Sequence, residues 1–284
     1  MAQGQTARSA IKAAMIGGFV AALALILPST GVRAAETAGQ GKITAQWSCA
    51  DFEKFLRSAA VVNVEKEAQA GRTLPWLVSL EKDGVRARAV FKYVHRPQPH
   101  PLAHSFRYEV AAYELSKLLQ LEIVPPTVER TIRGVRGALQ LYAENSLSER
   151  DRIRSGLEPP DAAAFRNSLD AVRLFEAMAG DACGNLDDTL IDKDLWRVCR
   201  VDLAEAFSLS PELAEDCLIE RCPRDLYERL LRMDPAATKK RLRVWLSGDE
   251  IAALCGRKDR IIAHLRERIR AMGEAAVLYP AKSE

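Results

Sequence analysis

The sequence lacks several motifs that would point to a common enzyme or metal-site class. Its six cysteines form no C-x-x-C pair, so a structural zinc site is not expected. No G-x-S-x-G segment occurs, so a serine hydrolase built on that turn has no support. Aromatic residues are sparse, at 6% of 284 residues, but 48% of the residues are hydrophobic and 28% charged. This composition predicts a packed core and excludes wholesale disorder.

The sequence also lacks net charge beyond its first 34 residues. The whole chain has 41 lysines and arginines against 38 aspartates and glutamates. Residues 1–34 contain three of the basic residues and no acid, which leaves 38 of each sign. Proteins that bind nucleic acids carry a basic excess, because they neutralise phosphates. A nucleic-acid partner is therefore not expected.

The first 34 residues combine a basic start with a short apolar segment. Arg8 and Lys12 precede an apolar run from Ala13 to Leu27, and small residues surround Ala34. This pattern predicts a signal peptide over residues 1–34, and the alternative is an uncleaved membrane anchor. The run is shorter than the roughly 20 residues that span a bilayer. We therefore expect a periplasmic or secreted protein with no stable membrane span after signal cleavage.

All six cysteines follow this segment, and an oxidising compartment would permit disulfides among them. They are Cys49, Cys183, Cys199, Cys217, Cys222 and Cys255. Cys217 and Cys222 are close enough in sequence for a local bridge. Buried free thiols are the alternative.

The rest of the chain divides by its hydrophobic patterns. Residues 35–55 are assigned to a flexible leader. Residues 56–146 are predicted to form five strands, at 59–65, 74–80, 85–94, 123–132 and 138–144, with a helix at 106–120. Residues 147–284 are predicted to be mainly helical, at 161–180, 224–233, 235–246, 248–255 and 257–273, with a hairpin over 189–201. Strands followed by helices predict an α+β fold with two lobes.

Three charged residues stand in an order that suits phosphoryl transfer. Lys92 lies on the third predicted strand, Glu109 begins the following helix, and Asp202 ends the predicted hairpin. In phosphoryl transfer a strand lysine held by a helix glutamate neutralises the phosphates, and a carboxylate holds Mg²⁺. Asp202 follows an apolar strand, where burial of a charge is costly without a partner. Taken singly, each of these residues has an ordinary surface interpretation.

Several segments in this order resemble the protein-kinase-like superfamily, specifically its divergent bacterial secreted and HipA-like branch of uncharacterised proteins. They are Gly71–Trp76, Val90–Tyr93, Tyr108–Tyr113, Val124–Arg130 and Arg200–Phe207. The resemblance covers about residues 56–270. It implies a two-lobed protein-kinase-like fold, with a β-rich N-lobe that carries one αC-type helix and a mainly helical C-lobe.

The resemblance also implies roles for residues of the N-lobe. Lys92 would pair with Glu109 and with the nucleotide phosphates. The loop that contains Gly71 and Arg72 would cover the phosphates, although it departs from the G-x-G-x-x-G pattern. Gln140 would begin the hinge between the lobes and meet the adenine.

In the C-lobe, the resemblance implies a metal site for Mg²⁺ or Mn²⁺. Asp202 and Asp188 would be metal ligands, and Glu205 could add a further oxygen. Asp188 and its acidic neighbours also have a simpler interpretation as a solvated turn.

The kinase pattern is incomplete at the catalytic base. If Asp188 takes the second-metal position, Cys183 stands where the base belongs, and if Asn185 takes it, Gly180 does. The nearest carboxylate is Asp181, which a rearranged loop could use as the base. The sequence thus predicts a secreted kinase-like phosphotransferase that uses ATP on the hydroxyl of an unknown protein, glycan or lipid acceptor. The alternative is a degenerate pseudokinase that acts as a periplasmic binding or scaffold protein.

Overall fold

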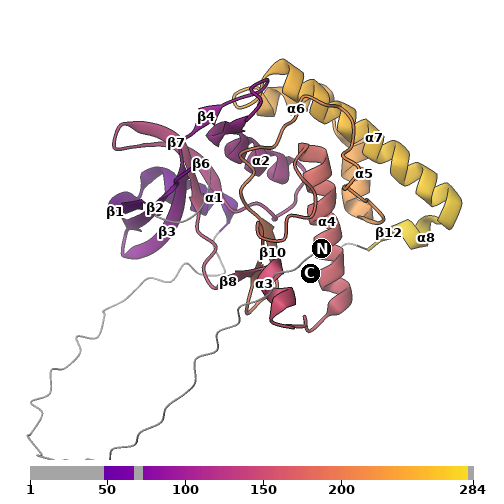
Figure 1. Ribbon diagram of the computed structural model, residues 1–284, viewed down its shortest axis with the longest axis horizontal. Coiled ribbons are helices and arrows are strands. Elements are labelled where there is room, and N and C mark those ends of the chain that lie inside the picture. Colours follow the sequence, from indigo (N-terminus) through magenta and orange to yellow (C-terminus); the bar gives the residue numbers. More distant parts are fainter. Residues whose placement is uncertain (1–47, 67–72, 281–284) are drawn as a thin grey trace, which may run out of the picture. The chain divides into compact units, whose positions relative to one another are not determined.

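The computed structural model describes residues 48–66 and 73–280 (Figure 1). Its first part is a five-stranded antiparallel sheet in the order β1-β2-β3-β7-β6. The strands are β1 (Ala60–Lys66), β2 (Trp76–Lys82), β3 (Val85–Lys92), β6 (Thr127–Ile132) and β7 (Val135–Leu141). Alternate residues of β2 are buried, as expected of a strand with one face on a core. The hydrophobic pattern predicts these five strands, but β7 lies three residues earlier than the predicted range 138–144.

Tight turns set the register of two hairpins in this sheet. Asp83 and Gly84 join β2 to β3, and Arg133 and Gly134 join β6 to β7, all with positive φ. Two consecutive residues of positive φ make the turn whose twist matches that of the strands. The prediction of a turn at Asp83-Gly84 is confirmed. The predicted strand over 123–132 begins only at Thr127, because two prolines just before it cannot donate to a ladder.

A helix covers each face of the sheet. Helix α1 (Cys49–Ser58) contributes Phe55 and Leu56 to a core with residues of β2, β3 and β7. Helix α2 (Phe106–Leu118) lies on the opposite face, where Phe106 and Val110 pack on Ala138. Helix α2 is buried on most of its surface because its other residues enter the core of the helical lobe.

Helix α1 corrects the prediction of a flexible leader over residues 35–55. Ser48 and Asp51 form a capping box that starts the helix. Residues 49–55 therefore belong to the folded part of the chain. Residues 1–47, which include the predicted signal peptide, lie outside the described residues.

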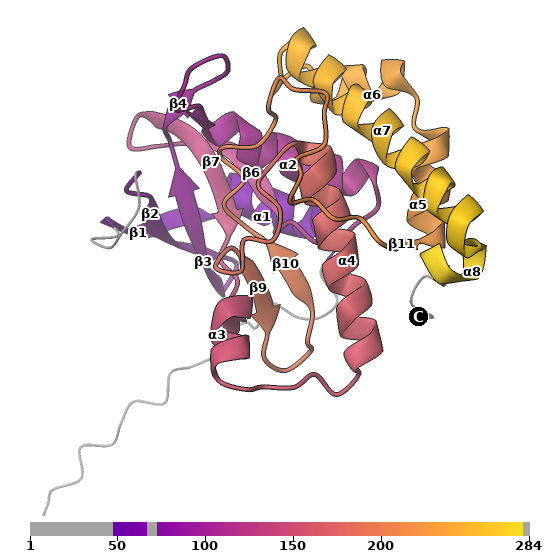
Figure 2. The same ribbon diagram turned by 45° about the vertical axis from the view of Figure 1, so that its right-hand side comes forward.

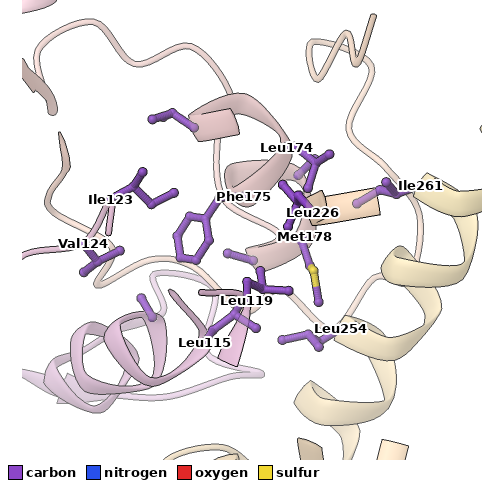
Figure 3. Close-up of a cluster of buried hydrophobic side chains, with 14 of the residues drawn as sticks. Leu115, Leu119, Ile123, Val124, Leu174, Phe175, Met178, Leu226, Leu254 and Ile261 are labelled. Carbon is purple, nitrogen blue, oxygen red and sulfur yellow. The ribbon is translucent and has the colours of Figure 1, made fainter. Parts of the chain in front are cut away.

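The second part is mainly helical. Its helices are α3 (Glu149–Arg154), α4 (Ala162–Ala179), α5 (Arg224–Arg232), α6 (Pro235–Leu242), α7 (Gly248–Met272) and α8 (Glu274–Val277). Figure 3 shows its core, in which Phe175 and Met178 of α4 lie among residues of α2, α5 and α7. No helix of the described ranges is long and apolar enough to cross a membrane.

The long helix α7 corrects the prediction of two helices that meet at Gly256. Both segments belong to one continuous helix. A Cβ added at Gly256 would lie 2.7 Å from the Cβ of Pro211. The glycine therefore permits close packing and does not end the helix.

Short strands complete the fold around the site described next. β9 (Thr189–Asp192) and β10 (Val198–Arg200) form the hairpin predicted over 189–201, and β8 (Ser146–Ser148) pairs with β9. β4 (His95–Arg96) pairs with β5 (His104–Ser105), and β11 (Cys222–Pro223) with β12 (Leu278–Tyr279). In Figure 2 the hairpin of β9 and β10 is labelled between α3 and α4.

Candidate active site

Lys92 and Glu109 form a buried ion pair between β3 and α2. Ser105 caps α2, which places Glu109 in the first turn of the helix. Lys92 is opposite Ala138 in the sheet, on the face that α2 covers. The Lys92 Nζ lies 2.5 Å from Glu109 Oε1, and the Glu109 side chain is fully buried. The other oxygen, Glu109 Oε2, is buried with no hydrogen-bond donor among the described residues.

Asp202 joins this pair from the helical lobe. Its Oδ1 lies 2.8 Å from Lys92 Nζ, and its side chain is 52% exposed. Asp202 has a φ of 58°, a left-handed conformation that non-glycine residues adopt mainly at constrained positions. Burial lowers the pKa of Lys92, but the charges of Glu109 and Asp202 outweigh burial and raise it. The charge of Lys92 in turn lowers the pKa of Asp202. Lys92 and Asp202 are therefore both ionised at neutral pH.

A second centre of charge lies beside the first, at the end of the hairpin. The guanidinium of Arg200 is only 2% exposed. Its Nε lies 2.7 Å from Glu176 Oε1, its Nη2 lies 2.7 Å from Asp181 Oδ2, and its Nη1 lies 3.5 Å from Asp188 Oδ2. One arginine thus serves three carboxylates. A buried charge is tolerated only with such partners.

Burial raises the pKa values of the acids around Arg200. Burial raises the pKa of Asp181 to about 7, although Arg200 opposes the shift. Burial and the charge of Asp202 raise the pKa of Asp188 to about 6. The backbone N–H of Val201 donates to the carbonyl oxygen of Asp188 over 2.9 Å, which places Asp188 beside the segment that carries Asp202.

Backbone geometry at the end of α4 positions Asp181. Gly180 ends the helix with a φ of 65°. A Cβ at this position would lie 2.6 Å from the Cζ of Arg257, whose guanidinium donates to the carbonyl oxygens of Met178 and Ser208. Glycine is required here both by conformation and by space.

A disulfide fixes the loop that follows Asp181. Cys183 is bonded to Cys217, with 5.2 Å between their Cα atoms. Cys183 is therefore not a thiol at the position of the base. The local bridge between Cys217 and Cys222 is not formed, because Cys217 is taken by Cys183, and Cys222 is a buried free thiol.

Of the remaining predicted site residues, the structure describes Gln140 and Glu205. Gln140 belongs to β7 and donates to Thr127 Oγ1 over 3.0 Å, so it precedes the connection between the lobes rather than lying in it. Glu205 Oε1 lies 3.5 Å from the Nδ1 of His104. Gly71 and Arg72 lie outside the described residues.

Sequence reasoning missed three contributors to the site: Arg200, Glu176 and His104. Arg200 and Val198 are both buried in β10, so the arginine occupies an inward position of an alternating strand. Glu176 interrupts the apolar stripe of α4. The Nε2 of His104 lies 3.3 Å from Thr73 Oγ1, on the side of the ring away from Glu205. Of these three residues, only Arg200 and Glu176 could be found from the sequence, because each is a charged residue inside an apolar pattern.

A solved structure of another protein agrees with this architecture. No protein-family model matches the sequence, and no curated protein matches it. The structure of hydra Fam20 with sugar is similar with a TM-score of 0.61 and 15% identity, over 83% of this chain and 93% of that chain. The Helicobacter pylori proinflammatory kinase CtkA gives a TM-score of 0.42 and 10% identity, over 74% of this chain and 96% of that chain. The chain has a protein-kinase-like fold with a β-sheet lobe and a helical lobe, as predicted.

Proposed function

We propose that this protein is a phosphotransferase that uses ATP and a divalent cation. The observation that carries the proposal is that Lys92 contacts Glu109 and Asp202 at once, although the three residues come from β3, α2 and the segment after β10. Phosphoryl transfer needs a lysine in this environment to neutralise phosphates. A lysine that served only the fold would not need a second, half-exposed acid.

The donor set fits a divalent cation. Five carboxylates surround two permanent cations, Lys92 and Arg200. They belong to Glu109, Glu176, Asp181, Asp188 and Asp202. No group of three or more ligating side chains is gathered around one point in the described part of the chain. Mg²⁺ typically takes one or two carboxylates and completes its shell with phosphate oxygens and water.

Asp188 and Asp202 are the residues that would hold Mg²⁺ or Mn²⁺, with Glu205 as a further oxygen donor. When bound, the cation would neutralise the β- and γ-phosphate oxygens. Lys92, oriented by Glu109, would bind the other phosphate oxygens. The loop with Gly71 and Arg72 would cover the phosphates, and the adenine would lie near Gln140 and the connection that follows β7.

Asp181 is the proposed base for the acceptor hydroxyl. Its pKa of about 7 suits a group that must accept a proton near neutral pH. The same residue supports the alternative of a pseudokinase, because Arg200 already binds its carboxylate. In a pseudokinase the nucleotide would bind without transfer.

We further propose that residues 1–34 export the chain, residues 56–146 form the nucleotide-binding lobe and residues 147–284 form the helical lobe with the metal-binding hairpin. The protein would then act in the periplasm or outside the cell, on a protein, glycan or lipid hydroxyl. The disulfide supports an oxidising compartment. We also propose that the chain belongs to the HipA-like and bacterial secreted branch, on the basis of the sequence segments that resemble it.

Thermal unfolding with ATP and Mn²⁺ tests nucleotide binding. A ligand at a hundredfold excess over its Kd stabilises the folded state by about 2.7 kcal/mol. We expect a rise in Tm for the native chain and none for Lys92→Ala or Asp202→Ala. Lys239→Ala and Asp216→Ala change exposed residues elsewhere and should keep the rise. An equal rise in all five proteins, or none in the native chain, would refute the proposal.

Transfer from radiolabelled ATP separates the enzyme from the pseudokinase. In Asp181→Asn, the enzyme hypothesis expects transfer to fall by about 10²-fold or more while the rise in Tm remains. Transfer undetectable in the native chain despite a clear rise in Tm would favour the pseudokinase.

A further inference from the structure

A hollow with a volume of about 710 Å³ lies between α5, α7 and α8 of the helical lobe. The residues that line it are far from Lys92 in the sequence. This volume is within the range of functional ligand sites. Figure 2 shows these helices on the side of the lobe away from the sheet. None of the proposed nucleotide or metal ligands lines the hollow.

The floor of the hollow is apolar. Leu231 of α5 is 44% exposed there, although it is a large hydrophobic residue. Tyr227 and Ile269 are partly buried and join the floor to the main core. Exposed apolar surface inside a concavity is typical of sites that receive another apolar group.

The rim of the hollow carries three arginines and two glutamates, and two of the arginines are not compensated by any described residue. Arg266 and Arg270 follow one another at a spacing of four residues on α7, so they lie on one side of the helix. Both are exposed, and neither has an ion-pair partner among the described residues. A cation in the last turn of a helix, such as Arg270, also interacts favourably with the helix dipole, but this effect does not extend to Arg266, one turn earlier.

Neighbouring arginines behave differently. Arg224, Arg229 and Arg232 of α5 are paired with Glu274, Asp225 and Glu228, respectively. This agrees with the alternation of acids and bases along the helix, which is typical of a solvated face. The two arginines of α7 are thus an exception at the edge of an apolar hollow.

We propose that this hollow, the α5–α7 groove, binds a short peptide segment of another protein that carries acidic side chains beside apolar ones. The apolar side chains would lie on Leu231 and Ile269, and the acidic ones would pair with Arg266 and Arg270. A groove between two helices suits such an amphipathic segment. Glu228 and Glu274 also line the hollow, but they are paired with Arg232 and Arg224, so the uncompensated charge in the described part of the chain is that of Arg266 and Arg270.

The test measures fluorescence anisotropy of a labelled amphipathic peptide of about three helical turns, with leucines along one side and glutamates along the other. At about 0.15 M salt, long-range attraction between exposed charges is screened. We expect the native chain to bind this peptide. A version with lysine for glutamate, and another with serine for leucine, should each bind at least about tenfold more weakly.

Paired variants locate the site. Arg266→Glu with Arg270→Glu should weaken binding by about tenfold or more, as should Leu231→Asp. Lys240→Glu with Arg243→Glu makes the same change of charge at exposed positions on and beside α6 and should change binding by less than about twofold. All variants should keep the native Tm, and their response to ATP and Mn²⁺ should equal that of the native chain.

Several results would overturn this proposal without touching the proposed function. The native chain could fail to bind the acidic peptide, or both double variants could weaken it equally, which would mean unspecific attraction. Anionic vesicles or RNA could displace the peptide and show the same sensitivity to Arg266 and Arg270. Sedimentation could show a dimer that dissociates when the groove is changed, which would make a second copy the occupant.

Discussion

Asp202 Oδ1 lies 2.8 Å from the ammonium of Lys92, although 110 residues separate the two in the sequence. The contact connects the last residue of a central strand to the residue that follows a hairpin of the other lobe. Each partner shifts the pKa of the other so that both stay charged. The pair therefore concentrates charge at one point in the fold.

Substitution of Lys92 should affect stability as well as binding. Lys92→Met would leave Glu109 fully buried without its cation, and breaking a buried pair in this way costs about 3–5 kcal/mol. Lys92→Met with Glu109→Gln should recover part of that loss, because no buried charge remains at either position. Urea unfolding measures both. If the double variant is less stable than Lys92→Met, the cost of the single substitution does not come from the unpaired charge of Glu109.

The pKa of Asp181 predicts a dependence of stability on pH. Its folded pKa of about 7 is above its ordinary value of 3.8, so the folded state binds more protons between these values. The stability that this carboxyl group contributes is therefore lost as the pH rises from about 4 to 7. Above pH 7 its contribution no longer changes with pH.

Asp181→Asn removes this titration and makes it measurable. Between pH 5 and pH 8, the free energy of unfolding of Asp181→Asn should rise relative to the native chain by about 3 kcal/mol. Chemical unfolding of both proteins at the two pH values gives the difference, in which other titrating groups cancel. A difference that does not change with pH would mean that the pKa of Asp181 is not raised.

The disulfide should contribute measurably to stability. It closes a loop with a sequence separation of 34, for which loss of chain entropy in the unfolded state predicts about 3–4 kcal/mol. Cys217→Ser should lower the free energy of unfolding by about this amount. Cys255→Ser changes a cysteine that has no disulfide and is the matched control. Equal effects of the two substitutions would contradict the prediction.

Gly180 should tolerate no side chain, for two separable reasons. Gly180→Ala adds the strain of a left-handed residue, about 1–2 kcal/mol, and a clash with Arg257. Gly184 has a similar φ of 74° but open space around it, so Gly184→Ala should cost the strain alone. Thermal unfolding should therefore show a larger loss at position 180. If the two losses are equal, Arg257 is not packed against this residue.

Local patterns were sufficient to predict most elements of the fold. The alternation around Val78 and the turn at Asp83-Gly84 predict strands and a hairpin that the structure contains. The predictions failed where one residue type has two uses. Two helices are predicted to meet at Gly256, but this glycine lies inside one helix and permits contact with Pro211. Ser48 was assigned to a leader, although it caps a helix.

The candidate site was predictable only in part, because it depends on pairing between distant segments. Lys92, Glu109 and Asp202 were recognisable by their order and are in contact in the structure. The bond between Cys183 and Cys217 was not, since six cysteines leave many pairings open. Nor does the sequence alone show that Arg200 is buried among acids rather than solvated.

The shared guanidinium of Arg200 has a consequence for how this chain can diverge. Its three acidic partners do not interact with it independently, so their substitution effects should not add. A descendant that lost the arginine alone would retain buried anions without a counter-charge. In homologous sequences we therefore expect position 200 and positions 176 and 181 to change together or not at all, as a coevolving set.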